Sequence, residues 1–204
     1  MTGAVNELEL LDWKRRIFEL YAEVRAEPEP AEAWRHWCAV RDELFRNHPQ
    51  TPLTEESRAR FTGVDYFPYD ASMRVLAAVE PAPDEVRRIA GSAGSCTRFG
   101  RFGLARFELA GSAHALELYW LEGYGGGVFL PFGDTTRGSE TYGGGRYLLD
   151  TVKGSDLGEV DRRLVLDFNF AYNPSCAYDP RWACPLTPPA NRLEIAVRAG
   201  ERMP

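Results

Sequence analysis

The chain has 204 residues, the length of one ordinary domain or one and a half, and 44% of them are hydrophobic and 26% charged. This composition is that of an average globular protein and excludes the disordered, collagen-like and coiled-coil classes. The formal net charge of −6 argues against nucleic-acid binding and against a basic membrane-surface protein. The chain lacks a run of about 18 apolar residues and an N-terminal secretory signal, so we expect a cytoplasmic protein.

Residues 6–62 are expected to be helical. In the first helix, apolar side chains recur at spacings of three and four and therefore share one face: Leu10, Trp13, Ile17, Leu20 and Val24. Asn6 and Glu9 resemble a capping box at its start, and the two prolines of segment 27–30 end it. These signals predict one long amphipathic helix near the N-terminus.

A second and a third helix follow in chain order. The second is predicted over residues 31–46, and the segment 47–49 ends it with a proline. Thr54 is expected to cap a short helix over residues 55–61. We interpret the two long helices as an antiparallel pair that packs on the rest of the chain. A dimerisation arm is the alternative that the same apolar faces allow.

From Met73 onward the apolar residues follow a period of two, which is typical of half-buried strands. The turns between these segments contain glycine. The predicted strands are roughly eight, with a ninth at the end: 73–80, 85–90, 95–100, 103–110, 114–121, 126–132, 145–152, 164–170 and 192–198. Their close spacing, without intervening helices, favours antiparallel pairing.

The sequence therefore predicts an α+β fold. We expect a mainly antiparallel β-sandwich or partly open barrel, with the N-terminal helical hairpin packed on it. Residues 1–62 form the helical extension and residues 63–204 the β domain. No linker rich in Gly and Ser divides the chain, so we treat the two parts as one compact unit.

Residues 131–147 differ from ordinary scaffold because five glycines are mixed with hydrogen-bonding side chains. Glycine lets a backbone approach a partner closely or take a positive φ angle. The polar side chains of this stretch are Asp134, Glu140, Thr141, Tyr142 and Arg146. The stretch is either a binding loop or a long hairpin that satisfies its own hydrogen bonds. It is not a phosphate-binding P-loop, because no Gly-Lys-Ser/Thr follows.

Arg146 is the residue of this stretch best suited to binding. Its guanidinium offers a fork for a carboxylate or a phosphate. The alternative is a bidentate pair with Glu140, Asp167 or Asp134 that fixes the loops. Both interpretations stay open on the sequence.

A second unusual stretch covers residues 167–192. Asp167 and Asn169 are expected on one face of a strand, followed by a proline-rich loop that carries Cys176 and Cys184. Its polar and aromatic residues include Tyr172 and Asn173, and the prolines make it stiff and extended. The alternative to a binding segment is a covering loop that shields a sheet edge.

Two strings in these stretches carry a family resemblance. "DTTRGSETYGGGRYL" and "LDFNFAYNPSCAYDPRWACPLTPPANRLEIAVRAGER" resemble the signature of the bacterial domain of unknown function 1684, over about residues 65–202. The resemblance implies no reaction, because none is established for that family. Ala190 stands where the family is expected to have Glu in a Pro-Pro-Glu-Asn pattern.

We therefore expect a small-molecule-binding protein or enzyme with a polar site between loop 133–147 and segment 167–192. The alternative is a non-enzymatic structural or partner-binding module in which these stretches only lock the fold. The candidate ligand-binding residues are Asp134, Glu140, Thr141, Tyr142, Arg146, Asp167, Asn169, Tyr172, Asn173 and Cys176. No metal site is expected, because no familiar His or Cys spacing occurs. The cofactor is unknown, and a nucleotide or flavin stays open on fold grounds alone.

Three chemistries deserve comparison. Glu140 and Asp167 could form an acid–base pair, and Cys176 could be a nucleophile if His114 lay beside it. Cys176 and Cys184 could be structural thiols, a reversible disulfide or ligand contacts. We predict that both are free, at least partly buried thiols and that neither is a catalytic nucleophile.

Overall fold

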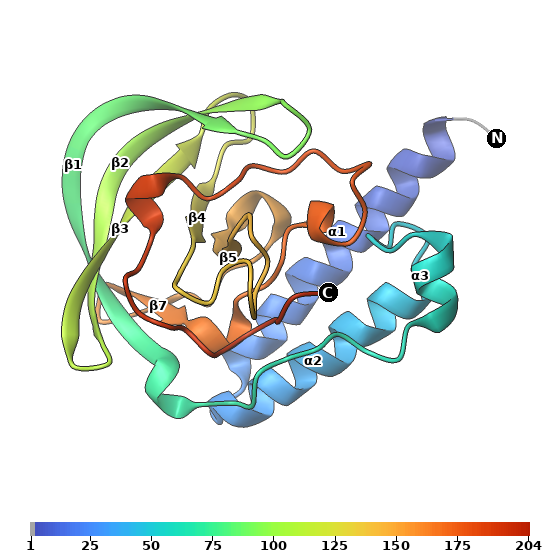
Figure 1. Cartoon of the computed structure of the whole chain (residues 1–204), viewed down its shortest axis with the longest axis horizontal. Coiled ribbons are helices and arrows are strands. Elements are labelled where there is room, and N and C mark those ends of the chain that lie inside the picture. The colour runs from blue at the N-terminus through green and yellow to red at the C-terminus, as the bar shows by residue number, and fades with distance from the viewer. Residues whose placement is uncertain (1–2) are drawn as a thin grey trace.

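The computed structural model describes residues 3–204 of the chain. Two long helices run side by side, α1 (Gly3–Ala26) and α2 (Pro30–Asn47), and a short helix follows, α3 (Glu55–Arg60). A curved antiparallel sheet packs beside the helices, and the irregular C-terminal segment crosses in front of the sheet in the view of Figure 1. The predicted helical pair is therefore confirmed, with its turn at the two prolines.

The start of α1 differs from the predicted capping box. The helix begins at Gly3, so Asn6 lies inside it. Asn6 and Glu9 instead accept hydrogen bonds from the Gln50 side-chain amide, at 2.5 and 3.2 Å. Their polar atoms therefore tie the segment after α2 to the first helix. The cap predicted at Thr54 is confirmed, because its side chain accepts from Ser57 N at 3.0 Å.

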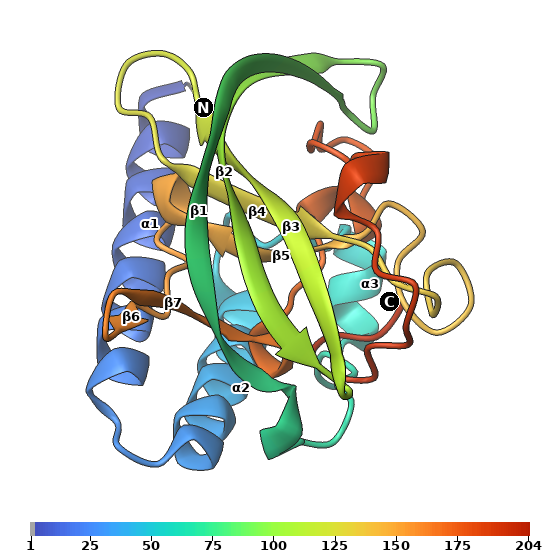
Figure 2. The ribbon, with the colours of Figure 1, turned by 90° about the vertical axis from the view of Figure 1, so that its left-hand side faces the viewer.

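One seven-stranded sheet forms the β part, in the spatial order β5-β4-β3-β2-β1-β7-β6, and every neighbouring pair is antiparallel. The strands are β1 (Arg74–Ala90), β2 (Cys96–Leu109), β3 (Ser112–Leu121), β4 (Val128–Phe132), β5 (Arg146–Asp150), β6 (Glu159–Val160) and β7 (Arg163–Asp167). The sheet curls strongly without closing (Figure 2). The α+β fold with helices packed on the sheet is confirmed, in its partly open form.

Four of the predicted strands merge into two long ones. β1 joins the segments expected at 73–80 and 85–90, and β2 joins 95–100 and 103–110. The pairing of β1 with β2 shifts register between Pro81 and Glu85, and that of β2 with β3 between Arg101 and Gly103. A bulge bends a strand without ending it, so the expected turns are bends within continuous strands.

The strand predicted at 164–170 ends early, at Asp167. Residues Phe168–Phe170 form a 3₁₀ turn because the Asp167 side chain accepts a hydrogen bond from Asn169 N at 3.0 Å. A side-chain cap of this kind competes with strand pairing. The expectation that Asp167 and Asn169 share one face of a strand is therefore wrong: Asp167 ends the strand, and Asn169 lies in the turn, in direct contact with the Asp167 side chain.

The ninth predicted strand, 192–198, is not a strand. Its backbone makes an isolated bridge from Arg192 to Gly133, and Thr135 N donates to Ile195 O at 3.1 Å. Farther along, Arg146 Nη2 donates a hydrogen bond to Val197 O at 2.9 Å. A side chain thus satisfies backbone groups that a neighbouring strand would otherwise satisfy. The alternating apolar residues still have a structural role, because Leu193 and Val197 are buried in the core.

Three apolar clusters hold these layers together. The main core lies on the concave side of the sheet, between the strands and the C-terminal segment, and includes Leu118, Phe132 and Val197. A second cluster joins both long helices to Phe170, whose ring lies 5.3 Å from that of Trp37. Burying one such side chain stabilises the fold by about 1.5–3 kcal/mol. The 3₁₀ turn after β7 is therefore one of the contacts that fix the helices to the sheet.

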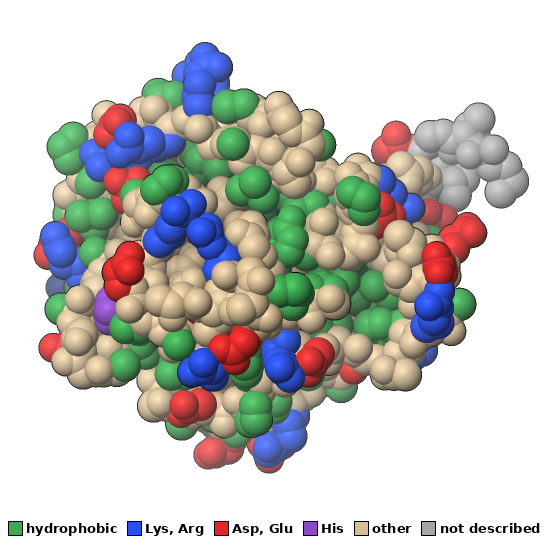
Figure 3. All heavy atoms as spheres, viewed as in Figure 1, with side chains coloured by type: hydrophobic (Ala, Val, Ile, Leu, Met, Phe, Trp, Pro, Cys, Tyr) green, Lys and Arg blue, Asp and Glu red, His purple; other side chains and the backbone are tan. Residues whose placement is uncertain are grey.

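Among the described residues, no helix is long and apolar enough to cross a membrane. On the face shown in Figure 3, basic and acidic side chains are interspersed over the described surface. That face therefore offers no broad area of a single charge sign.

Candidate functional site

The two unusual stretches are in direct contact, as expected. Tyr147 and Tyr172 exchange backbone hydrogen bonds of 2.9 and 3.1 Å. Gly133 N donates to Asn191 O at 2.9 Å, and Thr187 N donates to Gly144 O at 2.9 Å. The second stretch therefore runs along the first and supplies part of its hydrogen bonding.

Arg146 lies at the centre of this contact and is 1% exposed. Its Nη2 donates to Asp134 Oδ2 and to Val197 O, each at 2.9 Å. Its Nη1 donates to Glu201 O at 3.1 Å and to Ala199 O. Burial lowers the pKa of Arg146, although the Asp134 carboxylate opposes that shift. The guanidinium fork is therefore occupied by the chain itself, with Asp134 as its acidic partner.

Asp134 and Thr141 belong to the same buried network. Asp134 Oδ1 accepts from Thr136 N at 2.8 Å and from the Thr136 hydroxyl at 2.5 Å. The hydroxyl oxygens of Thr136 and Thr141 lie 2.9 Å apart. These side chains give the glycine-rich loop its shape, and their hydrogen bonds are made within the protein.

Glu140 and Asp167 make different contacts. Glu140 lies at the surface, where Arg198 Nη2 donates to its Oε1 at 2.8 Å. This hydrogen bond lowers the pKa of Glu140. Asp167 contacts Asn169 and Arg74 instead. The acid–base pair that the sequence left open for these two carboxyl groups is not formed.

Asn173 belongs to a second buried network, which sequence reasoning missed. Arg41 Nε donates to Glu201 Oε1 at 2.9 Å, and Asn173 N and the Tyr178 hydroxyl donate to Glu201 Oε2 at 2.7 and 2.9 Å. The Arg41 guanidinium also stacks on the Tyr172 ring, 5.2 Å from its centroid. The available signal was an arginine four residues from two aromatic residues on the buried face of a predicted helix.

Asp167 differs from the other two candidate carboxylates, Asp134 and Glu140, because one of its buried oxygens has no hydrogen-bond partner, a property it shares with Asn173 Oδ1 and Arg146 Nε. Its Oδ1 accepts from Asn169 N at 3.0 Å and from Asn169 Nδ2 at 2.8 Å. Its Oδ2 is buried without a partner, and the nearest cation is Arg74 Nε at 3.8 Å. Burial raises the pKa of Asp167 to about 6, against the opposing effect of Asn169.

Asp167 lines a cleft of about 270 Å³, called the Asp167 cleft here. It lies between the α1–α2 turn and the β6–β7 hairpin, which sits beside α1 in Figure 2. Ala33, Val165 and Phe170 form apolar walls, and charge of both signs comes from Arg25, Arg74, Glu27 and Glu159. None of the residues that line it comes from loop 133–147. A buried carboxylate oxygen without a hydrogen-bond partner, in the wall of a cleft, is a typical feature of a functional site.

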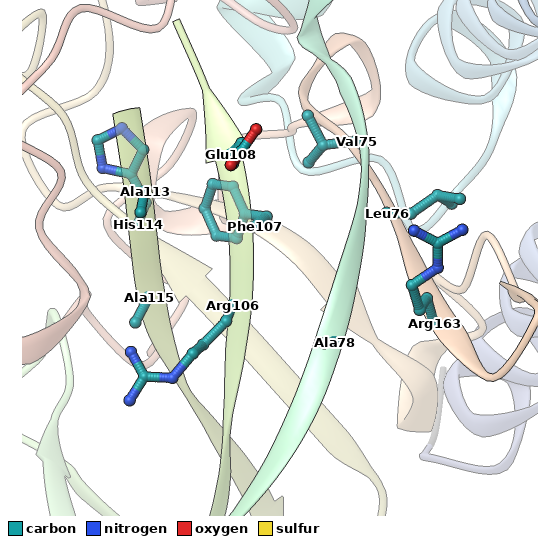
Figure 4. A pocket seen from close by; sticks show the side chains of 10 residues that line it. All are labelled: Val75, Leu76, Ala78, Arg106, Phe107, Glu108, Ala113, His114, Ala115 and Arg163. Carbon is teal, nitrogen blue, oxygen red and sulfur yellow. The ribbon is translucent and has the colours of Figure 1, made fainter. Parts of the chain in front are cut away.

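A larger hollow of about 810 Å³ lies on the sheet surface (Figure 4). Its side chains are spread over β1, β2, β3 and β7, and their polar ends do not converge. Arg106 is paired with Glu80, and His114 Nε2 lies 3.2 Å from Leu109 O. This hollow follows the curvature of the sheet and offers no focused polar group.

Cys176 and Cys184 are free thiols and both are buried, which confirms that part of the prediction. The Cys176 sulfur lies 3.6 Å from the Tyr142 hydroxyl oxygen. The His114 ring packs on Phe107, at 5.8 Å between ring centres, and does not serve Cys176. Within the described part of the chain, no three His, Cys, Asp or Glu side chains are grouped as metal ligands.

Comparisons with known proteins agree with the sequence resemblance. The family model described as "Protein of unknown function (DUF1684)" matches residues 59–202. A solution NMR structure of an uncharacterized protein of Haloarcula marismortui is similar to this chain, with 35% sequence identity and a TM-score of 0.57. The similarity covers 80% of this chain and 90% of that one.

This neighbour is haloarchaeal, so a bacterial origin is not confirmed. No curated protein matches the chain. The family match and the similar structure together show that the chain belongs to the DUF1684 family of proteins of unknown function.

Proposed function

We propose that this protein is a cytoplasmic small-molecule-binding protein and that its ligand occupies the Asp167 cleft. The observation that carries the proposal is the buried, unpartnered Asp167 Oδ2 in the wall of that cleft. The cytoplasmic location rests on sequence composition alone. Of the candidate residues, Asp167 would contact the ligand, and Asn169 would hold the carboxylate in place.

The chemistry of Asp167 defines the class of ligand. A carboxylate oxygen without a donor favours a ligand that brings one, such as an ammonium, amide or hydroxyl group. The cleft volume of about 270 Å³ is close to the lower end of about 300–1,000 Å³ for small-molecule pockets. We therefore infer a compact metabolite with an amine or hydroxyl group directed at Asp167 Oδ2.

A nuclear magnetic resonance titration tests this proposal. We expect ethanolamine, putrescine or glycerol, but not acetate, to shift the backbone amides of Gly158, Val165 and Asn169. Asp167→Asn should weaken that binding at least about tenfold, because its side chain places a donor where the carboxylate had an acceptor. Asp161→Asn is the matched control, since the Asp161 side chain is 83% exposed on the same hairpin.

Two results contradict the proposal. One is that none of the three donor ligands shifts the amides of the cleft. The other is that the wild type and Asp167→Asn respond equally. In either case Asp167 is not a ligand-binding residue for this chemical class.

The second candidate function is a non-enzymatic structural or partner-binding module. The observation that favours it is the Arg146 network, in which both terminal nitrogens donate to groups of the chain itself. Under this alternative the two signature stretches only fix the C-terminal segment. The ligands of the titration should then not shift the backbone amides of the Asp167 cleft.

A further inference from the structure

Arg74 and Asp167 lie opposite each other on two neighbouring strands at the Asp167 cleft. Arg74 begins β1, Asp167 ends β7, and their Cα atoms are paired in the antiparallel register of the two strands. Residues directly opposite in such a pair place their side chains on the same face of the sheet. Both residues line the cleft, so the fold puts a cation and a carboxylate side by side in its wall.

The two charges are neighbours that are not hydrogen-bonded to each other. Arg74 Nε lies 3.8 Å from Asp167 Oδ2, about 1 Å longer than a charge-assisted hydrogen bond. Asn169 holds the carboxylate in place, because its N and Nδ2 both donate to Asp167 Oδ1. Asn169 is itself fixed, since its Nδ2 donates to Asp70 O at 2.8 Å and its Oδ1 accepts from Asp70 N at 2.9 Å. The carboxylate is therefore held in one orientation with one oxygen left for a ligand.

The Arg74 guanidinium also keeps hydrogen-bonding capacity. Within the described chain, Asp167 is its only acidic neighbour at ion-pair distance, and its terminal nitrogens make no hydrogen bond; its side chain is 34% exposed. The other arginine of the cleft is engaged, because Arg25 Nη1 donates to Asp156 O at 2.6 Å. Arg74 therefore offers donors to a ligand, as Asp167 offers an acceptor.

We propose that the ligand of the Asp167 cleft is an α-amino acid with a small apolar side chain, an inference that rests on the function proposed above. The ligand's ammonium group donates to Asp167 Oδ2, and its carboxylate accepts from the terminal nitrogens of Arg74. Because the two protein groups are neighbours, the two ligand groups must be neighbours too. A single carbon separates them in an α-amino acid, whereas an ω-amino acid has to fold back to bring them together.

The rest of the cleft suits the side chain of such a ligand. Its apolar walls are Ala33, Val165 and Phe170, and its volume of about 270 Å³ admits only a compact molecule. Glu27 and Glu159 also line it and are exposed, so they repel an acidic side chain. A zwitterion without net charge and with an aliphatic side chain, such as valine, meets these conditions.

Nuclear magnetic resonance titration of the full chain at pH 7 with matched ligands tests the inference. Valine should shift the backbone amides of Gly158, Val165 and Asn169. It should bind at least about tenfold more tightly than valinamide, which lacks the carboxylate, and than N-acetylvaline, which lacks the ammonium group. γ-Aminobutyrate should bind no more tightly than ethanolamine, because its two charges are far apart.

Arg74→Met separates the carboxylate contact from the rest of the site. It should bring the affinity for valine to within about twofold of that for valinamide, and ethanolamine should bind at least as tightly as to the wild type. Arg163→Met is the matched control and should keep the preference for valine. Arg163 lies on the same strand as Asp167, its side chain is 47% exposed, and it does not line the cleft.

The outcomes separate this inference from the proposed function. If ethanolamine shifts the amides of the cleft and valine binds no more tightly than valinamide, the ligand is not an α-amino acid and the proposed function stands. If none of these ligands shifts the amides, both are wrong. The comparison of valine with valinamide on the wild type decides this even if Arg74→Met fails to fold.

Discussion

Arg146 shows how a side chain suited to anion binding can serve the fold. Its position among glycines and polar residues fits a ligand loop, and the same fork fits three backbone carbonyls and one carboxylate. Sequence reasoning identified Asp134 as a partner but not the carbonyls, because they come from a segment about 50 residues away. Of the two roles that the sequence left open for Arg146, the pair with Asp134 is the one that its contacts show.

Arg146→Met should destabilise the protein by about 3–5 kcal/mol, because it leaves the buried Asp134 carboxylate without its cation. Arg198→Met is the control and should cost under about 1 kcal/mol, since its pair with Glu140 is exposed. Urea unfolding measures both. Equal costs for the two variants would contradict a structural role of Arg146.

Asp167 should make stability depend on pH in an unusual direction. Its pKa rises from 3.8 to about 6 on folding, so the unfolded chain loses this proton at lower pH than the folded chain. Stability is therefore lost as the pH rises from about 4 to about 6, and stays lower above that range. A carboxylate that costs stability where it stands fits a functional role better than a structural one.

Asp167→Asn should be more stable than the wild type by about 2 kcal/mol at pH 8, because it removes the buried charge. At pH 4 the two proteins should be nearly equal. Thermal unfolding across this pH range measures the difference, with Asp161→Asn as a variant that should follow the wild type. A constant difference at all pH values would show that the Asp167 charge is not its cause.

At the scale of elements, the C-terminal segment replaces a strand with a backbone path that only one glycine allows. Gly200 has a φ of +77°, and a Cβ there would lie 2.5 Å from Ala171 O and 2.7 Å from Phe168 O. The C-terminal segment passes close to two other parts of the chain. Phe67 N donates to Gly200 O at 2.9 Å, and Glu201 N donates to Ala171 O at 2.8 Å. This close approach joins the end of the chain to the 3₁₀ turn after β7.

Gly200→Ala should therefore destabilise the protein through both backbone strain and crowding. Gly111→Ala is matched to it, because Gly111 has a φ of +75° and open space at its Cβ position. We expect about 1 kcal/mol for Gly111→Ala and an additional 1–3 kcal/mol, roughly, for Gly200→Ala. Chemical denaturation measures both, and equal losses would mean that the backbone shifts to relieve the crowding.

At the scale of the whole molecule, the helices and the sheet share apolar surface. Leu20 and Trp37 pack with Phe170 in one cluster, and Arg41 of α2 pairs with Glu201 near the C-terminus. Buried contacts between the two parts favour cooperative unfolding. The division into residues 1–62 and 63–204 stays a prediction. Buried contacts connect the two parts across that boundary.

Full-length protein should unfold in one calorimetric transition whose calorimetric and van't Hoff enthalpies agree. Removal of residues 1–60 should give a poorly soluble β part, because it exposes the apolar surface around Phe170. Sedimentation and thermal melting of the truncated chain measure this. A monomer that melts at the full-length temperature would contradict a stabilising role of the helices.

The sequence by itself determined the features that depend on near neighbours. The two long helices follow from apolar spacing and from prolines at positions 28 and 30, and the cap at Thr54 from its own side chain. The strand period gave the antiparallel sheet, and the polar glycine-rich and proline-rich strings marked the stretches that touch. These signals act over a few residues, so periodicity and capping chemistry capture them.

The tertiary structure alone decided what depends on distant partners. Bulges merged predicted strands into longer ones. Residues 192–198 stayed irregular, and Arg146 bonds to the Val197 carbonyl there. Arg41 met Glu201, 160 residues away in the chain. The tertiary structure also left Asp167 Oδ2 without a hydrogen-bond partner in a cleft formed with the α1–α2 turn, away from loop 133–147. Burial and hydrogen-bond partners arise from segments that meet only after folding, and the local patterns of the chain do not specify which atoms of those segments will pair.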